Sequence, residues 1–309
     1  MQTISQPILT SEQLLSALMV NIYALLHISP KSLLRHPVDW ITRQPLLRFC
    51  QMFVEADHTL SQKGIAATAR WLLMSRFVRD ICTHGQEQVP TSGPLVVVAN
   101  HPGAYDSVAI TASLGRDDLS IVASGIPFFK RLPTISQHLI FSTADTTVRM
   151  SVIRETIRHL QNGGAVLIFP TGHIDPDPSF MQGSAESVDG WSSSVEIFLR
   201  KVPETRLLPA VVSGVLSPRA IRHPLTRLES EGWKRQRVAE LIQLFGQVLL
   251  PRQTLREPKI SFGSPLNFYE IGARRATQSF KEFVASLEKR LIDEHVAFFY
   301  QEGKGLVND

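Results

Sequence analysis

Residues 95–106 read LVVVANHPGAYD, and this stretch decides the fold. The four apolar residues 95–98 follow Pro94 and lack helical spacing, which predicts a short strand buried on both faces. Turn-forming residues then carry His101 and Asp106, and apolar residues at helical spacing follow them. We therefore expect the histidine and the aspartate at a strand-to-helix turn, where open α/β sheets bind their ligands.

The rest of the chain after residue 95 alternates between the same two patterns. Short apolar runs predict strands at 119–123, 165–169, 207–212 and 260–262. Helical spacing of apolar residues predicts helices at 148–161, 191–199, 233–249 and 279–300. The apolar positions of the third of these helices are 233, 238, 241, 242, 245, 248 and 249. This alternation predicts an α/β fold with a mixed, mainly parallel sheet flanked by helices.

The first 85 residues show a helical pattern that differs from the rest of the chain. They predict a small N-terminal helical domain, followed by an α/β domain over 86–309. The boundary is expected within 86–94, which holds two prolines, one glycine and small polar residues. Three early prolines, Pro30, Pro37 and Pro45, are expected to break the chain into short helices. Residues 64–84 predict one amphipathic helix that stops at Gly85. This helix either packs on the next domain or is a basic helix at a membrane interface.

Residues 13–30 raise the question of a membrane span. This run of 18 residues has no Lys, Arg, Asp or Glu, but Ser16, Asn21 and His27 interrupt it. A spanning helix needs roughly 20 apolar residues. We therefore expect a buried or membrane-surface helix rather than a span, and we expect no signal peptide.

The positive charge of the chain is concentrated in one segment. The formal net charge is +4, and residues 216–259 carry nine Lys or Arg against four Glu. Such a patch meets the phosphates of a lipid, a coenzyme or a nucleic acid, or else it is a solvated helix face. Cys50 and Cys82 lack metal-ligand spacing and are most simply buried thiols of a reducing compartment.

The pair His101 and Asp106 has the residue types of a general base and its orienting carboxylate. A neutral imidazole takes the proton of an attacking alcohol, and the carboxylate holds the ring in the useful tautomer. The alternative is a histidine that satisfies loop carbonyls and an aspartate that caps the next helix. The chain has no G-x-S-x-G elbow, zinc motif, Walker loop or dinucleotide fingerprint. We therefore expect no metal and no nucleotide cofactor, and a proton donor that belongs to the substrate.

Asn100, His101 and Asp106 resemble the N-H-x4-D motif of the glycerolipid acyltransferases, which include the glycerol-3-phosphate and lysophosphatidic acid enzymes. Three later segments, in the same order as in that family, resemble its further blocks: 125–131 (GIPFFKR), 169–172 (FPTG) and 208–211 (LPAV). Four blocks in order are far more specific than one H-x4-D, and the resemblance covers residues 90–266. In the third block, the family's F-P-E-G-T-R is altered, because Thr171, His173 and Ile174 replace its Glu, Thr and Arg.

This resemblance implies an O-acyltransferase in which His101 is the general base and Asp106 its partner. It assigns substrate binding to Asn100, Arg131, Thr171 and Gly172, and His173 is a further polar candidate or a plain loop histidine. The implied donor is acyl-CoA or acyl carrier protein, without any other cofactor. The altered third block suggests a lyso-lipid or glycolipid acceptor other than glycerol 3-phosphate.

The implied setting is cytoplasmic and peripheral, on the inner face of a membrane, with lipid and acyl-donor partners and no nucleic acid. Two other functions compete with this one. A silent lipid- or carrier-binding member of the fold would keep the site without turnover. A hydrolase would release fatty acid without an acceptor, and the missing nucleophile elbow counts against it.

Overall fold

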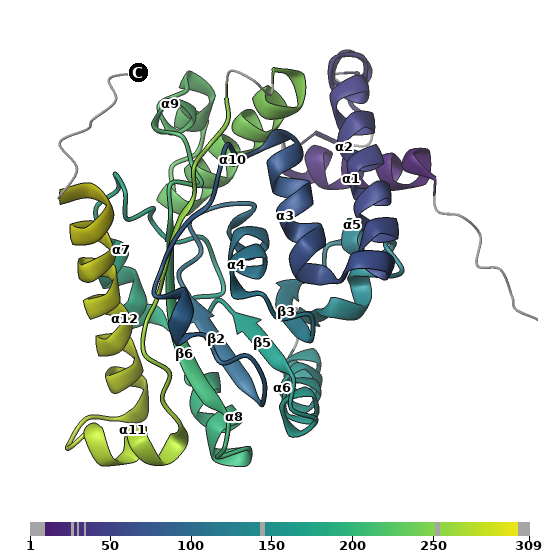
Figure 1. The fold of residues 1–309 in the computed structure, drawn as a ribbon. Helices are drawn as coiled ribbons and strands as arrows, with labels where there is room; N and C mark the ends of the chain where they lie inside the picture. The colour runs from purple at the N-terminus through teal and green to yellow at the C-terminus, as the bar shows by residue number, and fades with distance from the viewer. Residues whose placement is uncertain are drawn as a thin grey trace, which may run out of the picture.

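The computed structural model describes residues 10–25, 28–29, 31–33, 35–142, 146–250 and 254–301. It contains a seven-stranded sheet in the order β1-β7-β6-β2-β5-β3-β4 (Figure 1). Neighbouring strands run parallel except for β6 and β7, so the predicted mixed, mainly parallel sheet is confirmed. The strands are β1 Cys82–His84, β2 Leu95–Ala99, β3 Leu119–Ser124, β4 Leu139–Ser142, β5 Ala165–Ile168, β6 Arg206–Ser213 and β7 Lys259–Phe262.

Helices precede, connect and follow these strands. The α-helices are α1 Ser11–Leu25, α2 Arg35–Lys63, α3 Ile65–Arg76, α4 Asp106–Leu114, α5 Pro127–Lys130, α6 Thr146–Gln161, α7 Ser184–Ser187, α8 Ser194–Lys201, α9 Pro218–Ile221, α10 Gly232–Leu249, α11 Phe268–Arg274 and α12 Phe280–Val296. Shorter 3-10 turns are η1 Gln86–Gln88, η2 Ile135–His138, η3 Val188–Gly190 and η4 Pro224–Leu228, and a π-helical turn, η6 Ala297–Gln301, extends α12. The four strands predicted after β2 each lie within one residue of β3, β5, β6 and β7.

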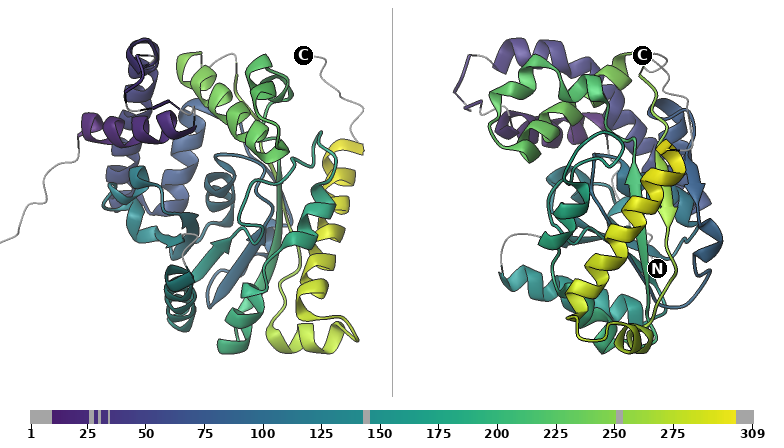
Figure 2. Two further views of the ribbon diagram at one scale, coloured as in Figure 1. Left: turned by 180° about the vertical axis from the view of Figure 1, so that it is seen from behind. Right: turned by 90° about the vertical axis from the view of Figure 1, so that its left-hand side faces the viewer.

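The central strand β2 is fully buried because helices cover both faces of the sheet. Leu95, Val97 and Ala99 belong to a core cluster that also contains residues of α2, α3 and α4. Val96 and Val98 point the other way, into a cluster with α8, α11 and α12. Figure 2 shows the sheet between these two helical layers. Two-sided burial explains why the strand reads as one continuous apolar run.

The N-terminal helices form a third apolar cluster with α5. Leu14, Leu15 and Ile22 of α1 pack there with Leu46 and Cys50 of α2, alongside residues of α5 and the loop after it. The described part of the 13–30 run is thus a packed helix, while His27 and Pro30 lie outside the described residues. No helix in the described ranges is long and apolar enough to cross a membrane.

Two predictions for the first 85 residues are wrong. Pro37 and Pro45 do not end helices, because α2 continues through both. Pro37 lies in the first turn, where no backbone donor is needed. Pro45 is buried, and its neighbour Leu46 packs in the third cluster, so the packing of α2 offsets the hydrogen bond that Pro45 removes.

The helix predicted over 64–84 also ends early. It stops at Arg76, and the chain then pairs with Arg256 and forms β1 beside β7, so tertiary pairing overrides the helical pattern. The domain boundary at residue 86 stays a prediction, although β1 lies on its N-terminal side and α2 and α3 share a core cluster with the sheet.

Arg116 organises the loops at the amino ends of the strands. Its side chain is buried and binds both carboxylate oxygens of Asp118, at 2.7 and 2.5 Å. It also donates to the carbonyl oxygens of Pro90, Gly93 and Gly163. One guanidinium therefore ties the segment before β2 to the turns before β3 and β5.

We predict that Arg116→Lys lowers the free energy of unfolding by about 2–4 kcal/mol, because an ammonium cannot replace the forked guanidinium and leaves buried acceptors unpaired. Urea denaturation measures this loss. Arg200→Lys, on an exposed pair with Glu196, is the control and should change stability by less than about 0.5 kcal/mol. Equal effects of the two substitutions would contradict the role given to Arg116.

Candidate active site

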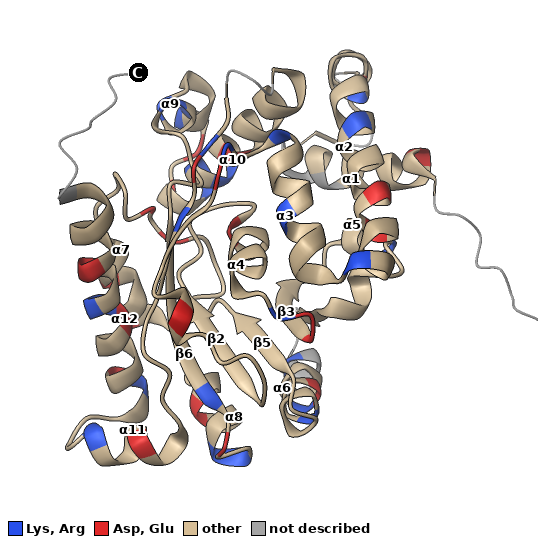
Figure 3. Ribbon diagram, viewed as in Figure 1, with Lys and Arg blue, Asp and Glu red and all other residues tan. Residues whose placement is uncertain are grey.

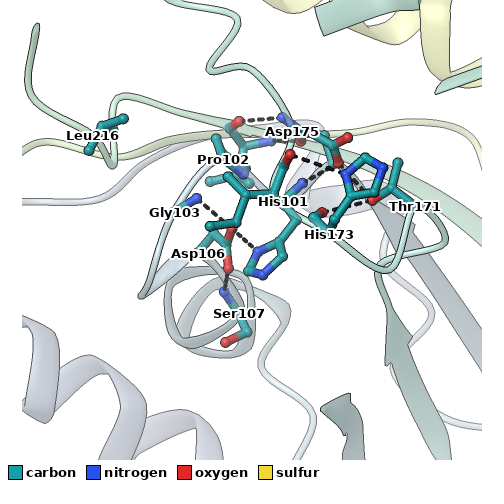
Figure 4. Close-up of polar contacts among 12 residues, drawn as sticks. His101, Pro102, Gly103, Asp106, Ser107, Thr171, His173, Asp175 and Leu216 are labelled. Carbon is teal, nitrogen blue, oxygen red and sulfur yellow. Dashed lines mark hydrogen bonds and ion pairs between the residues drawn. The ribbon is translucent and has the colours of Figure 1, made fainter. Parts of the chain in front are cut away.

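Asp106 is the first residue of α4, and its side chain is completely buried. One carboxylate oxygen, Oδ2, lies 2.7 Å from His101 Nδ1 and accepts the Gly103 N–H at 3.0 Å (Figure 4). The other oxygen accepts the N–H of Ser107 at 2.5 Å. Three donors thus meet the hydrogen-bonding needs of a buried carboxylate. The structure brings His101 and Asp106 together across the turn, as the sequence predicts.

The contact with Asp106 determines which nitrogen of His101 is free. A carboxylate only accepts hydrogen bonds, so Nδ1 carries the proton and donates it. The neutral ring then has its basic lone pair on Nε2. The ring stacks on Phe169, with centroids 4.6 Å apart and planes 24° apart, while 31% of the side chain stays exposed. His101 is therefore held in one orientation and reachable by a substrate.

Three carboxyl groups act on the protonation of His101. Burial lowers the pKa of His101, but the charge and hydrogen bond of Asp106, with further contributions from Glu240 and Asp175, outweigh burial and raise the pKa to about 9. Since only the neutral ring accepts a proton, base catalysis by His101 increases as the pH rises toward that value.

Asp175 ties the loop after β5 to the loop that carries His101. Its Oδ2 accepts the backbone N–H of His101 at 2.9 Å, and its own N–H donates to the His101 carbonyl oxygen at 2.8 Å. The Thr171 hydroxyl lies 3.1 Å from the same Oδ2. Burial raises the pKa of Asp175 against these hydrogen bonds. The backbone of the candidate base is thus fixed by a residue 74 positions later in the chain.

Asp177 extends this anchoring to the loop after β6. Its buried carboxylate accepts the Gly214 N–H at 3.0 Å, as well as the N–H and hydroxyl of Ser179. The loops that follow β2, β5 and β6 are therefore joined through two aspartates two residues apart. These three strands are neighbours in the sheet, so their carboxyl ends meet at one edge.

Asn100 joins the end of β2 to β6. Its side-chain amide donates to the Val212 carbonyl oxygen at 2.9 Å and accepts the Val212 N–H at 2.8 Å. The side-chain amide therefore links the end of β2 to β6. The substrate contact predicted for Asn100 stays a prediction.

The other predicted substrate residues fall into two groups. Thr171, Gly172 and His173 lie in the turn after β5, close to His101, and His173 is exposed (Figure 4). Gly172 has a φ of 70° and donates to the Phe169 carbonyl oxygen, which closes that turn. Arg131 instead donates to the Gln13 carbonyl oxygen of α1 at 3.0 Å. Within the described residues, no hydrogen bond or ion pair joins Arg131 to His101 or Asp106.

Sequence reasoning missed Asp175, Asp177, Phe169 as a stacking partner, and Glu240 of α10. The repeated D-P-D of residues 175–177, in a long polar loop, is the one local signal that points to anchoring carboxylates. Glu240 carries no such signal, because it is one charge in a basic helix.

Two cavities in the described part of the chain lie away from this site. The larger, about 140 Å³, lies between the β1–β7 edge and α12, and the smaller lies between α8 and α12. His101 lines neither of these two cavities. Among the described residues, no group of three His, Cys, Asp or Glu side chains could hold a metal ion.

Comparison with known proteins agrees with this geometry. Residues 80–194 match the family model described as Acyltransferase. The match spans β2, His101, Asp106 and the turn after β5, so residues 80–194 are an acyltransferase domain, as the resemblance implies.

The chain is also similar to the crystal structure of the 1-acyl-sn-glycerophosphate (LPA) acyltransferase PlsC from Thermotoga maritima. The TM-score is 0.44 at 15% identity, over 94% of this chain and 97% of that chain. None of the curated proteins compared matches the chain.

We predict that Asp175→Ala lowers the free energy of unfolding by about 2–4 kcal/mol, since it leaves the part-buried His101 N–H without its acceptor and removes one of the two acceptors of the Thr171 hydroxyl. Hydrogen exchange of the segments 100–106 and 170–177 should also become faster. The control is Asp189→Ala, which removes an exposed pair with Lys289. Unchanged exchange in Asp175→Ala would show that Asp175 does not hold the two loops together.

Proposed function

We propose that this acyltransferase moves a fatty acyl group from acyl-CoA or acyl carrier protein to a hydroxyl of a lyso-lipid or glycerolipid precursor, with His101 as general base. The observation that carries the proposal is the 2.7 Å contact between His101 Nδ1 and Asp106 Oδ2, which leaves Nε2 free. The family match supports acyl transfer, and the substrates are inferred from the chemistry of the site.

The proposed reaction needs no protein nucleophile. Nε2 of His101 accepts the proton of the acceptor hydroxyl while that oxygen attacks the thioester carbonyl carbon. The carbonyl π electrons move onto oxygen, and they return when the carbon–sulfur bond breaks. The Nε2 proton then passes to the leaving thiolate. Asp106 stabilises the imidazolium that exists between these two proton transfers.

The charges around His101 favour an acceptor other than glycerol 3-phosphate. The charged groups that act on His101 are the carboxyl groups of Asp106, Glu240 and Asp175. Thr171 replaces the family's acidic residue and is engaged with Asp175, and Arg131 is engaged with α1. A phosphate close to the reacting hydroxyl would face carboxylates without a clamp. We therefore propose an acceptor whose hydroxyl lies farther from any phosphate, as in a lyso-lipid with another head group or a glycolipid.

The end of the molecule near the site suits a membrane surface on the cytoplasmic side. Exposed apolar side chains gather there on α2, η4 and α10: Trp40, Ile41, Leu225, Leu228, Trp233, Leu249 and Leu250. Basic residues lie on η4 and α10: Arg227, Arg235 and Arg237 are exposed, and Lys234 is half-buried. Figure 3 shows basic residues along α10. We call this set the α2–α10 face. Apolar and basic side chains together bind anionic lipid surfaces.

We predict that His101→Ala lowers acyl transfer by about 10²–10⁴-fold with the fold intact, because the base is lost. Mass spectrometry of lipid products, after incubation with acyl-CoA and a mixed pool of lyso-lipids, measures the transfer. His58→Ala, at an exposed position of α2, is the control and should leave transfer unchanged.

Two outcomes of that experiment would contradict the proposal. If the natural protein and His101→Ala both show only the same background level of acyl transfer, the result would favour a silent lipid- or carrier-binding protein. Release of free fatty acid without any acceptor would favour a hydrolase.

We also predict that the protein floats with vesicles containing anionic phosphatidylglycerol and floats much less with neutral phosphatidylcholine vesicles. Trp40→Asp should weaken the binding several-fold, because it places a charge on the α2–α10 face. Tyr269→Asp is the matched control, since Tyr269 is an exposed aromatic residue on α11 at the opposite end of the molecule (Figure 1). Flotation that is independent of anionic lipid would exclude this mode of membrane binding.

A further inference from the structure

The helix α10 buries a polar stripe against the loops of the active site. Its members are Gln236, Glu240, Gln243 and Gln247, spaced by four, three and four residues, so they share one helix face. Three of them, the glutamines, are among the buried residues of α10, whereas the apolar Trp233 and Leu249 are exposed. The buried face of α10 is therefore mainly polar, which the apolar pattern of 233–249 does not show.

Each glutamine of this stripe binds a loop at the carboxyl edge of the sheet or the segment beside it. Gln236 donates to the carbonyl oxygens of Pro102 and Asp175, at 2.8 and 2.7 Å. Gln243 binds the Tyr105 hydroxyl at 3.0 Å and the Val215 carbonyl oxygen, and Gln247 binds the Phe77 carbonyl oxygen. These hydrogen bonds hold the stripe against the turn that carries His101 and Asp106.

Glu240 is the ionisable member of the stripe, and it shares with Gln247 a buried side-chain oxygen that lacks a hydrogen-bond partner among the described residues. It lies one turn after Gln236, and its Oε1 is buried without a hydrogen-bond partner in the described part of the chain. Its carboxyl interacts electrostatically with His101 and Asp106, and Arg237 of the same helix is the other charge that acts on it. A buried carboxyl oxygen without a partner is costly. Glu240 lies between Gln236 and Gln243, which bind Pro102 and Tyr105 of the turn that carries His101, so this position calls for an explanation.

We propose that Glu240 is a positioning residue of the active site, whose carboxyl on the stripe of α10 stabilises the imidazolium that His101 becomes when it takes the acceptor's proton. This inference rests on the proposed role of His101 as the base. Glu240 acts through His101 and needs no contact with the substrate. It adds a third carboxyl group to those that Asp106 supplies from α4 and Asp175 from the loop after β5.

The protonation of the two groups is coupled. Burial raises the pKa of Glu240 to about 8, and the positive charge of His101 opposes that rise. The negative charge of Glu240 in turn favours protonated His101. A neutral side chain of the same shape at position 240 therefore lowers the pKa of His101.

The test is Glu240→Gln, a nearly isosteric change to the residue type of its stripe neighbours. The pH dependence of acyl transfer should rise toward alkaline pH in the natural enzyme, and in the variant the apparent pKa of this limb should fall by about 1. The variant should lose activity at alkaline pH, because its base is weaker. Below neutral pH, its activity should fall by a smaller factor or should rise above that of the natural enzyme. Glu240→Asp, which keeps the charge, should retain the alkaline limb.

A second measurement reports the protonation of His101 without requiring acyl transfer. Diethyl pyrocarbonate modifies only neutral imidazole, and mass spectrometry of peptides reports the modification of each histidine. The pH at which His101 becomes reactive should fall by about 1 in Glu240→Gln. The control is Glu294→Gln on α12, which changes an exposed glutamate that pairs with Arg290. This exposed pair is engaged away from the stripe of α10, so the control should leave the His101 curve in place.

The two measurements separate the possible failures. A shifted modification curve in a protein that never transfers acyl groups would refute the proposed function and leave the link between Glu240 and His101 standing. Active enzyme whose rate falls equally at every pH in Glu240→Gln, with an unshifted His101 curve, would overturn the inference and leave a purely structural glutamate.

Discussion

The hydrogen bond between His101 Nδ1 and Asp106 Oδ2 is the interaction on which the site depends. It exists because a short buried strand ends at Ala99 and a helix begins at Asp106, so the turn between them brings two side chains five residues apart into contact. The amides of Gly103 and Ser107 complete the coordination of the carboxylate. With Nδ1 engaged and Phe169 against the ring, Nε2 is the nitrogen left for a substrate.

The sheet order explains why this turn is rigid. β5 and β6 flank β2, so the loops after all three strands meet at one edge, where Asp175 and Asp177 cross-link them. The helix α10 covers the same edge through Gln236. Long-range polar contacts thus hold the local pair, and the charge they place around His101 is negative. A site of this composition stabilises an imidazolium well and a phosphate poorly, which links its architecture to the choice of acceptor proposed above.

The sequence predicts the elements whose signals are local. β2, its turn and α4 follow from an apolar run, turn formers and helical spacing, and the His101–Asp106 contact follows from that geometry. The end of α3 at Arg76 could not be predicted, because β1 forms through pairing with a strand more than 170 residues later. Pro45 lies inside α2 because Leu46 and Cys50 anchor that helix in the third core cluster, which offsets the lost hydrogen bond. The polar face of α10 was equally hidden, since glutamines become interior residues only when particular carbonyl groups lie opposite them.

The central claim is that Asp106 holds His101 in the tautomer whose Nε2 is basic. Nitrogen-15 NMR of the histidine ring tests this most directly, with His101 assigned from the signal lost in His101→Gln. Nδ1 should stay protonated across the titration while Nε2 loses its proton as the pH rises. A neutral ring that carries its proton on Nε2 would contradict the account, because no basic nitrogen would then face the substrate.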